Sequence, residues 1–309
     1  MSAGDAPERG RPADPLLELR FALAESDATP TPARLRARVV AAAAAARPPG
    51  RSVPAPDHIS GAEVFRRMVV RLDDLLGDLA PAEWHAPALR DLDVQGLVGH
   101  LIGVEEAFAA ALDGTGTLGA DDHVNATQPT AAAQASRPPA STHRDWFDRA
   151  TATIAAAATH DPAASVAFYG VTAPLDAVLV VRAFEMWIHE EDIRRATDRP
   201  LIAPDGEQLA RMIDLVVRLL PDGVAATGHD VASKTVRLVL TGPGGGTWDV
   251  NLDGAAQPRR GDVRVVVDGT EFCRVAGNRS DLTGSGAIVR GDREPASVLF
   301  AGAANLALD

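Results

Sequence analysis

Apolar residues recur at helical spacing through the middle of the chain. After Ser60 they lie three and four positions apart, as on the buried face of an amphipathic helix: Val64, Met68, Val69, Leu72, Leu75 and Leu76. Similar patterns predict helices over residues 94–112, 142–159, 174–199 and 204–220, and Asp93 can cap the first of these. This order predicts a bundle of four or five helices at residues 60–222.

Two other segments lack such a pattern. Residues 115–141 are rich in alanine, threonine and proline, and we expect them to form a long loop. Loops of this length are uncommon in compact domains and often act as lids or binding segments. Residues 1–13 are polar and expected to be disordered, whereas residues 14–46 hold two short helical patterns. Because prolines follow, residues 1–59 read as a disordered or helical arm and linker.

The pattern changes to alternation in the last part of the chain. Residues 235–240 and 247–252 alternate as strands do, and the glycines between them predict a hairpin turn. Further strands are expected over 263–267 and 286–290, with short helices capped by Thr270 and Asp292. The predicted fold class is therefore α+β, with the helical bundle followed by a small α+β domain at residues 234–309.

Composition and charge narrow the classes of function. The chain has 309 residues and a net charge of −12. A nucleic-acid surface needs a local excess of Lys and Arg, so we expect no DNA or RNA partner. Cys273 is the only cysteine, which excludes an intrachain disulfide and a cysteine zinc cluster. Neither a secretory signal nor a run of membrane-spanning length is present, so we expect a cytoplasmic protein with no membrane partner.

The fourth predicted helix carries a polar stripe on an otherwise apolar sequence. Arg182, Glu185, His189 and Asp192 share one face. A helix that is apolar nearly all round lies in an interior, where a carboxylate and an imidazole are costly unless both are satisfied. A divalent metal satisfies both, and Glu185 with His189 has the spacing of a helical ligand pair. The alternative is a buried ion-pair network of Arg182 with Glu185 and of His189 with Asp192.

His100 on the second predicted helix is the candidate third ligand. Glycines at 96, 99 and 103 surround it, and each is unfavourable by about 1 kcal/mol inside a helix. We therefore expect another helix to approach closely there, bringing His100 near the polar stripe. Two histidines and one glutamate with an open position is a zinc arrangement, and the same set can hold Fe(II). The alternative for His100 is a core histidine bonded to a backbone carbonyl.

His123 lies in the predicted long loop. It is a candidate cofactor-binding residue that could reach the metal from a lid, and the alternative is a solvated loop histidine. Cys273 lies between Phe272 and Arg274 on a predicted helix, where we expect it to be a packed core residue.

The positions of His100, Glu185 and His189 resemble the mycothiol-dependent maleylpyruvate isomerase family, within the DinB-like superfamily of metal-binding helical bundles. In that family one histidine comes from the second helix, and a glutamate and a histidine come from an E-x-x-x-H segment on a later helix. The segments 271–279 and 289–292 are similar to the sterol-carrier-like domain that often follows. The resemblance covers about residues 60–309 and does not include the first 50 residues.

The resemblance implies a mycothiol-dependent enzyme, an isomerase or an S-transferase. Mycothiol is a small thiol of actinobacteria, and a composition rich in Ala, Arg, Gly and Pro with a single lysine fits such a source. Zinc would lower the pKa of the thiol and hold it as thiolate, which could add to an electrophilic substrate. Rotation and elimination would complete a cis–trans isomerisation like that of maleylpyruvate. Stopping at the adduct, or displacing a leaving group, would be S-transfer.

Arg182 and Asp192 are the candidate catalytic residues. Maleylpyruvate carries two carboxylates, so we expect a nearby cation, for which Arg182, Arg194 and Arg195 are available. For Arg194 and Arg195 we favour salt bridges to neighbouring carboxylates. Asp192 is spaced to orient His189 without binding the metal itself. The alternative function is a non-catalytic metal-binding bundle that acts as a binding or regulatory module, with a protein partner for the N-terminal arm.

Overall fold

The chain divides into two compact units, Met1–Pro54 and Ala55–Asp309. The computed structural model describes residues 56–116, 123–168, 170–231, 233–257, 259, 261 and 263–307, together with Arg38. Of the predicted arm and linker, residues 1–59, the structure describes only Arg38 and residues 56–59. In the described ranges, no helix combines the length and the apolar character that a membrane span requires.

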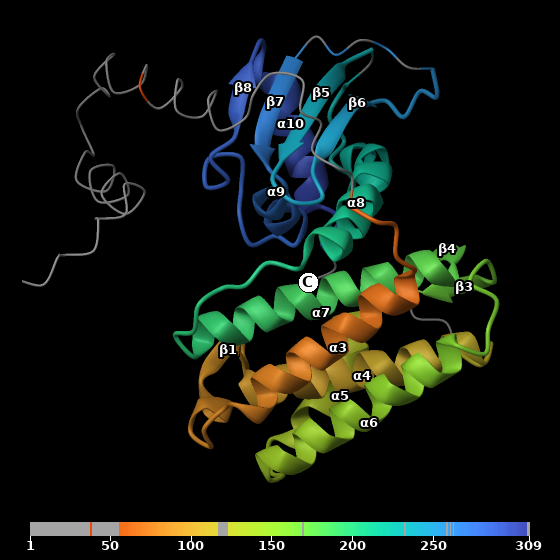
Figure 1. The fold of residues 1–309 in the computed structure, drawn as a ribbon, viewed down its shortest axis with the longest axis vertical. Helices are drawn as coiled ribbons and strands as arrows, with labels where there is room; N and C mark the ends of the chain where they lie inside the picture. The colour runs from red at the N-terminus through yellow and green to blue at the C-terminus, as the bar shows by residue number, and fades with distance from the viewer. Residues whose placement is uncertain are drawn as a thin grey trace, which may run out of the picture. The chain divides into compact units, whose positions relative to one another are not determined.

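The second unit contains a helical part and a mixed part of helices and strands (Figure 1). The helical part consists of α3 (Gly61–Gly77), α4 (Val94–Leu112), α5 (His123–Gln134), α6 (Pro139–Ala157) and α7 (Leu175–Ala196). The helices α3, α4, α6 and α7 agree with the sequence prediction to within a few residues at each end.

Local signals explain where α3 and α4 begin. The hydroxyl of Ser60 accepts a hydrogen bond from the backbone N–H of Glu63 at 3.2 Å. The carboxylate of Asp93 accepts one from the backbone N–H of Gly96 at 2.8 Å. Each cap satisfies a donor that the first turn of the helix leaves unpaired. The apolar positions that predicted α3 are all buried in the structure.

The segment predicted as a long loop contains the helix α5, so that prediction was wrong. The sequence of α5 has no amphipathic pattern and includes Pro129, which is why periodicity missed it. Close contact with α4 holds it in place. The side-chain amide of Gln95 on α4 donates to the backbone carbonyl of Gln134 at 2.7 Å. A Cβ atom added at Gly99 would lie only 2.8 Å from the Cα of Ala131, so the glycine is needed for this approach.

Two short hairpins were not predicted. One pairs β1 (Pro87–Leu89) with β2 (Leu92–Asp93) just before α4, and the other pairs β3 (Ser165–Phe168) with β4 (Val171–Pro174) just before α7. Strands of two to four residues are too short to show a clear alternation. Both hairpins lead directly into the helices that carry the candidate metal ligands.

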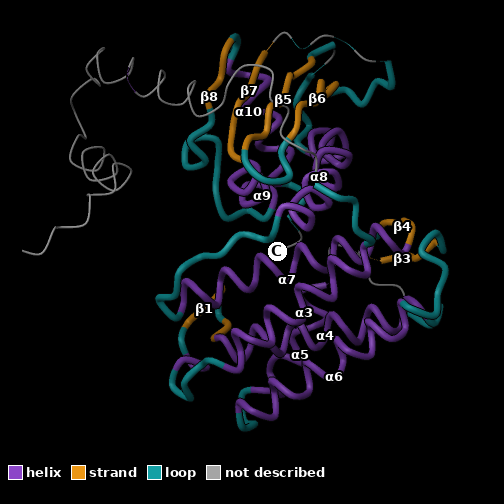
Figure 2. The backbone as a smooth tube through the Cα atoms, viewed as in Figure 1, coloured by secondary structure: helices purple, strands orange, loops and turns teal. Residues whose placement is uncertain are grey.

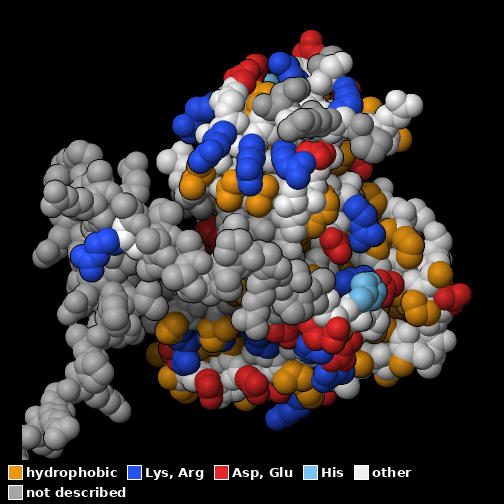
Figure 3. Space-filling model, turned by 45° about the horizontal axis from the view of Figure 1, so that its top comes forward, with side chains coloured by type: hydrophobic (Ala, Val, Ile, Leu, Met, Phe, Trp, Pro, Cys, Tyr) orange, Lys and Arg blue, Asp and Glu red, His pale blue; other side chains and the backbone are white. Residues whose placement is uncertain are grey.

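The mixed part contains a four-stranded sheet in the order β6-β5-β7-β8 (Figure 2). The strands are β5 (Thr235–Thr241), β6 (Gly246–Asn251), β7 (Val263–Asp268) and β8 (Ile288–Arg290). The predicted hairpin of β5 with β6 is antiparallel, β5 with β7 is parallel, and β7 with β8 is antiparallel. This register places Arg237, Arg264 and Arg290 in one row across the sheet. Figure 3 shows basic side chains gathered on this part of the surface.

Three helices accompany the sheet: α8 (Gly206–Ala226), α9 (Gly269–Ala276) and α10 (Arg293–Ala304). Asp292 caps α10 as predicted, but Asp268 and not Thr270 caps α9. The helix α8 continues past its predicted end, with Pro221 inside it. A Cβ atom at Gly223 of α8 would lie 2.2 Å from the carbonyl oxygen of Gly302 of α10, so these two helices pack backbone to backbone.

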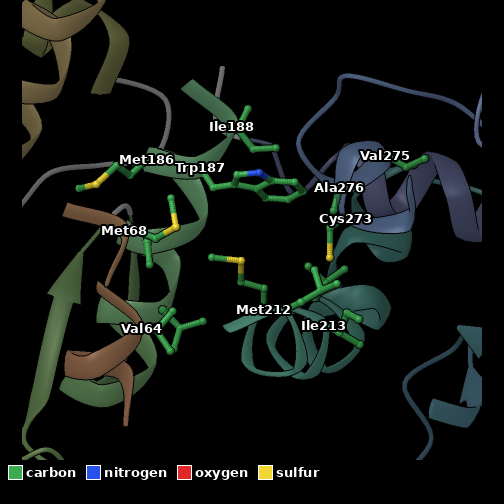
Figure 4. Packing of buried hydrophobic residues seen from close by; sticks show 14 of the residues in the cluster. Val64, Met68, Met186, Trp187, Ile188, Met212, Ile213, Cys273, Val275 and Ala276 are labelled. Atoms are coloured by element: carbon green, nitrogen blue, oxygen red, sulfur yellow. The ribbon is translucent and has the colours of Figure 1, made fainter. Parts of the chain in front are cut away.

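An apolar core connects the mixed part to α7. Trp187 and Ile188 of α7 face Met212 and Ile213 of α8 and Cys273 of α9 (Figure 4). Gly277, which ends α9, is so close to α7 that an added Cβ atom would lie 2.4 Å from Ile188. The side of α7 that faces the mixed part is therefore fixed against it, and the opposite side faces the other helices of the bundle.

Candidate metal centre

His100, Glu185 and His189 come together where α4 passes α7. One potential ligand atom from each lies within 4.8 Å of the others. The Nε2 of His100 is 3.5 Å from a carboxylate oxygen of Glu185, and the ring centroids of the two histidines are 5.3 Å apart. Ligand atoms of tetrahedral zinc lie about 3.4 Å apart, as follows from bonds of about 2.1 Å. A small contraction of the three side chains would bring them to that spacing.

Both imidazoles are held by a second partner at Nδ1. The Nδ1 of His100 lies 2.7 Å from the hydroxyl of Thr127 on α5. The Nδ1 of His189 lies 3.2 Å from the carboxylate of Asp192, one turn further along α7. Such partners hold the ring of a ligating histidine in a fixed orientation. The arrangement leaves Nε2 of each ring as the nitrogen for a ligand bond, so the donor set fits a divalent ion.

Arg182 is fully buried beside the candidate ligand Glu185. Its guanidinium forms one ion pair with Glu185, 3 residues along the same helix, and another with Glu105 of α4 at 2.7 Å. Thr153 of α6 donates a hydrogen bond to the same Glu105 carboxylate at 2.7 Å. The guanidinium therefore balances two interior carboxylates, and its exposed fraction is 0%. Arg182 therefore lies in the interior next to Glu185 and has no contact with solvent.

The charge of Glu185 is stabilised in this setting. Burial is the largest single influence and disfavours the carboxylate, but Arg182, His100 and His189 outweigh it and hold the pKa well below its usual range. Glu185 is thus ionised at neutral pH, as a metal ligand must be. The ion-pair network and the metal-ligand set are compatible, since the structure contains the predicted ion pairs and the ligand cluster together.

Asp192 links the candidate ligand His189 to the mixed part of the unit. One of its carboxylate oxygens accepts from Arg279, which follows α9, at 2.7 Å, while the same oxygen lies against His189. Burial disfavours the charged form, but Arg279 and His189 bring the pKa of Asp192 down to about 2. Asp192 is therefore a carboxylate that holds His189 in place and is itself held by an arginine.

The remaining candidates lie elsewhere. The sequence favoured salt bridges of Arg194 and Arg195 to Asp192 or Glu191. Arg195 does pair with Glu191 at 2.8 Å, whereas Arg194 pairs with Glu190 at 2.6 Å. His123 begins α5, but its side chain lies outside the described residues. The glycine-rich face of α4 does admit a close neighbour, and that neighbour is α5 rather than α7.

A cavity of about 220 Å³ opens beside the two candidate histidine ligands. It is lined by residues of the β1–β2 hairpin and of α4, α5 and α7: Leu89, Arg90, Asp91, Leu92, Leu97, His100, Gln128 and His189. Sequence reasoning missed the contributions of Thr127, Gln128 and Arg90. Nothing in their local sequence distinguishes them, because the hairpin and α5 were not predicted.

Comparison with known proteins gives a family match and a fold match. Residues 65–194 match the family model described as the mycothiol maleylpyruvate isomerase N-terminal domain, and this range contains all three candidate ligands. A crystal structure of the mycothiol-dependent maleylpyruvate isomerase is similar, with 17% identity, a TM-score of 0.50, and coverage of 72% of this chain and 92% of that chain. No curated protein matches.

A second solved structure, of a histidine-to-alanine mutant of the mycothiol-dependent maleylpyruvate isomerase, has the same identity and coverage and a TM-score of 0.48. At this level of identity the likeness of the first structure is one of fold.

Proposed function

We propose that this chain, whose residues 65–194 carry a mycothiol maleylpyruvate isomerase N-terminal domain, is a mycothiol-dependent metalloenzyme. The observation that carries the proposal is the cluster of His100, Glu185 and His189, with both Nδ1 atoms engaged and a cavity beside the rings. We propose zinc as the metal. The likeness in fold supports a DinB-like bundle for the helical part, and we propose a sterol-carrier-like domain for residues 234–309.

The sulfur that reacts should come from a cofactor. Cys273 is fully buried in the core, and burial raises the pKa of its thiol far above the usual range. It lies on α9, away from the cavity that the histidines line. A divalent metal bound by the cluster would lower the pKa of a mycothiol thiol and present it as thiolate.

The residues of this chain prepare the site for that chemistry. Thr127 and Asp192 hold the two imidazoles at Nδ1, so Nε2 is the nitrogen of each ring that would bind the metal. Arg182 keeps Glu185 ionised without leaving the interior. The cavity accommodates a small electrophile beside the histidines. We propose that a thiol adds to an activated double bond, that the resulting single bond rotates, and that elimination regenerates both the thiol and the isomerised double bond. S-transfer is the same addition without the elimination.

Metal content is the first test. We expect purified protein to hold about one zinc per chain, because three ligands and an open position suit that ion. His189→Ala should lose the metal. His160→Ala is the matched control, because His160 is an exposed histidine at the end of α6 whose Nδ1 contacts the carbonyl of Ala156. Full retention of zinc in His100→Ala and His189→Ala would remove the basis of the proposal.

Thiol binding is the second test. Calorimetric titration with mycothiol should give an affinity roughly ten-fold or more higher for the zinc-loaded protein than for the metal-free protein, since thiolate binding depends on the metal. The affinity should fall as the pH falls, because protons compete for the thiolate and for both imidazoles. Equal affinities in the two forms would favour a non-catalytic binding module instead.

A further inference from the structure

The turn between β1 and β2 projects onto the cavity beside the candidate metal ligands. It consists of Arg90 and Asp91, and the flanking residues Leu89 and Leu92 are paired across the hairpin. The strand β2 ends at Asp93, which caps α4. The turn is thus connected without a flexible loop to the helix that carries His100. Arg90 and Asp91 both line the cavity, together with His100 and His189.

The backbone of Arg90 is held in an unusual conformation. Its φ angle is +51°, in the left-handed region. For a residue with a Cβ atom this region costs about 1–2 kcal/mol, a cost that glycine would avoid. A long cationic side chain at this position therefore needs a reason other than the turn itself. Strain of this kind often marks a functional position.

Arg90 differs from the other arginines considered for substrate binding. Arg182, Arg194 and Arg195 are each committed to carboxylates of the protein. Within the described ranges no carboxylate forms an ion pair with Arg90, and its side chain is exposed at the wall of the cavity. A guanidinium in this setting can bind the two oxygens of a carboxylate at once.

We propose that Arg90 is the specificity-determining residue that binds a carboxylate of a small-molecule substrate in the cavity at the metal cluster. The inference rests on the proposed function for the identity of the site. A volume of about 220 Å³ lies below the range of about 300–1,000 Å³ that drug-sized ligands occupy, so the cavity fits a small organic acid. Arg90 binds the acid group, and the reacting carbons lie toward His100 and His189.

Asp91 lines the same cavity next to Arg90 in the turn. A negative charge at this position opposes the binding of an anion. Asp91→Asn should therefore leave the affinity for a carboxylate unchanged or raise it.

The test uses maleate, a small cis-dicarboxylate, as a probe of the zinc-loaded full-length protein. Calorimetry should show that Arg90→Gln weakens maleate binding roughly ten-fold, as expected for a lost charged hydrogen bond at a partly exposed site. Arg90→Lys should weaken it less, because it keeps the charge and loses the planar fork. Arg66→Gln is the matched control, since Arg66 is an exposed arginine on α3 that pairs with Glu63. The neutral diamide of maleic acid should bind all forms alike.

Two further measurements separate the possible outcomes. Arg90→Gly removes the charge and relieves the backbone, so it should raise or preserve the thermal midpoint and still weaken maleate binding. Zinc content, measured on the same variants, should not change. If the wild type holds no zinc and binds no mycothiol while Arg90→Gln still weakens maleate binding, the proposed enzyme fails and the anion site stands. Wild-type protein that does not bind maleate, or equal binding by Arg90→Gln, overturns the role of Arg90.

Discussion

Arg182 is a buried cation that supports the candidate metal ligand Glu185. It lies completely inside the bundle and neutralises Glu105 and Glu185, which come from different helices. The guanidinium also lies over the ring of Phe168, 5.9 Å from its centroid, which adds a cation–π contact. An interior charge of this kind is stable only while its partners are present. The candidate ligand Glu185 and Arg182 therefore depend on each other for their charged forms.

Replacement of Arg182 tests this dependence. Arg182→Met should lower the free energy of unfolding of the metal-free protein by about 3–5 kcal/mol, because two buried carboxylates lose their common cation. Zinc should restore part of the loss, since a divalent ion at Glu185 replaces the missing positive charge. Urea unfolding with and without zinc measures both effects.

Arg194→Met serves as the comparison for Arg182→Met. Arg194 also pairs with a buried carboxylate, but Glu190 keeps Arg71 as a second cation at 2.8 Å. Its loss should cost much less stability, and zinc should not compensate for it. Similar costs for the two variants, or no effect of zinc on Arg182→Met, would contradict the proposed role of Arg182.

Cys273 allows a separate prediction at the scale of one residue. Burial raises the pKa of its thiol, so the reactive thiolate is scarce throughout the neutral and mildly alkaline range. An alkylating reagent should modify the folded protein slowly and the urea-unfolded protein quickly, and mass spectrometry can follow both. Cys273→Ala should keep mycothiol-dependent activity within a few-fold. Rapid alkylation of the folded protein, or loss of activity with metal content intact, would point to a protein thiol in the reaction.

At the scale of elements, the contact of α5 with α4 determines the orientation of His100. The helix α5 supplies Thr127, whose hydroxyl meets the imidazole, and it can approach because α4 presents glycines. A Cβ atom at Gly103 would lie 3.0 Å from the methyl group of Thr127, and one at Gly99 would lie 2.8 Å from the backbone of Ala131. The glycines thus weaken the helix locally and permit the packing that positions His100.

Gly99→Ala separates these two effects. Alanine favours the helix by about 1 kcal/mol, but the clash with the backbone of α5 should cost about 1–3 kcal/mol and displace Thr127. We expect a net loss of stability and weaker zinc binding, measured by urea unfolding and by competition with a zinc chelator. Gly77→Ala is the control, because the nearest atom to its added Cβ would be 3.9 Å away. A stabilised Gly99→Ala with unchanged zinc affinity would show that α5 does not depend on this contact.

At the scale of the whole molecule, ion pairs join the bundle to the mixed part near the candidate metal ligands. Arg274 of α9 pairs with Glu191 at 2.7 Å, and Arg279 pairs with Asp192 at 2.7 Å. Both carboxylates are buried on α7, next to the apolar contact of Ile188 with Gly277. Through Asp192, the position of the mixed part is coupled to the orientation of His189.

This junction should respond to acid in a defined range. The pKa of Asp192 falls from an ordinary 3.8 to about 2 on folding. A group with a lowered pKa in the folded state stabilises the protein above its ordinary pKa, and that stabilisation is lost as the pH falls through the folded value. For metal-free protein, the advantage of the wild type over Asp192→Asn should therefore shrink by about 2 kcal/mol between pH 4 and pH 2. A constant difference across this range would contradict the ion pair.

Much of this architecture follows from local signals in the sequence. The helices α3 and α4 could be predicted because Ser60 and Asp93 are N-caps and apolar residues follow at helical spacing. The hairpin of β5 with β6 could be predicted from alternation and a glycine turn. The helix α5 could not, since its residues have no periodic pattern and its stability comes from contact with α4. The spacing of Glu185 and His189 fits both a metal site and an ion-pair network. The resemblance to a known family favoured the metal site.

The sequence by itself determined that a histidine and a glutamate share one face of an apolar helix, because that follows from the helical repeat. Only the tertiary structure decided which groups surround the candidate site. Thr127 of α5 contacts His100, Glu105 of α4 pairs with Arg182, and Arg279 after α9 pairs with Asp192. Arg90, in an unpredicted turn, lines the cavity. These contacts span many residues of sequence, and no local pattern encodes them, because they depend on how the helices and the sheet pack together.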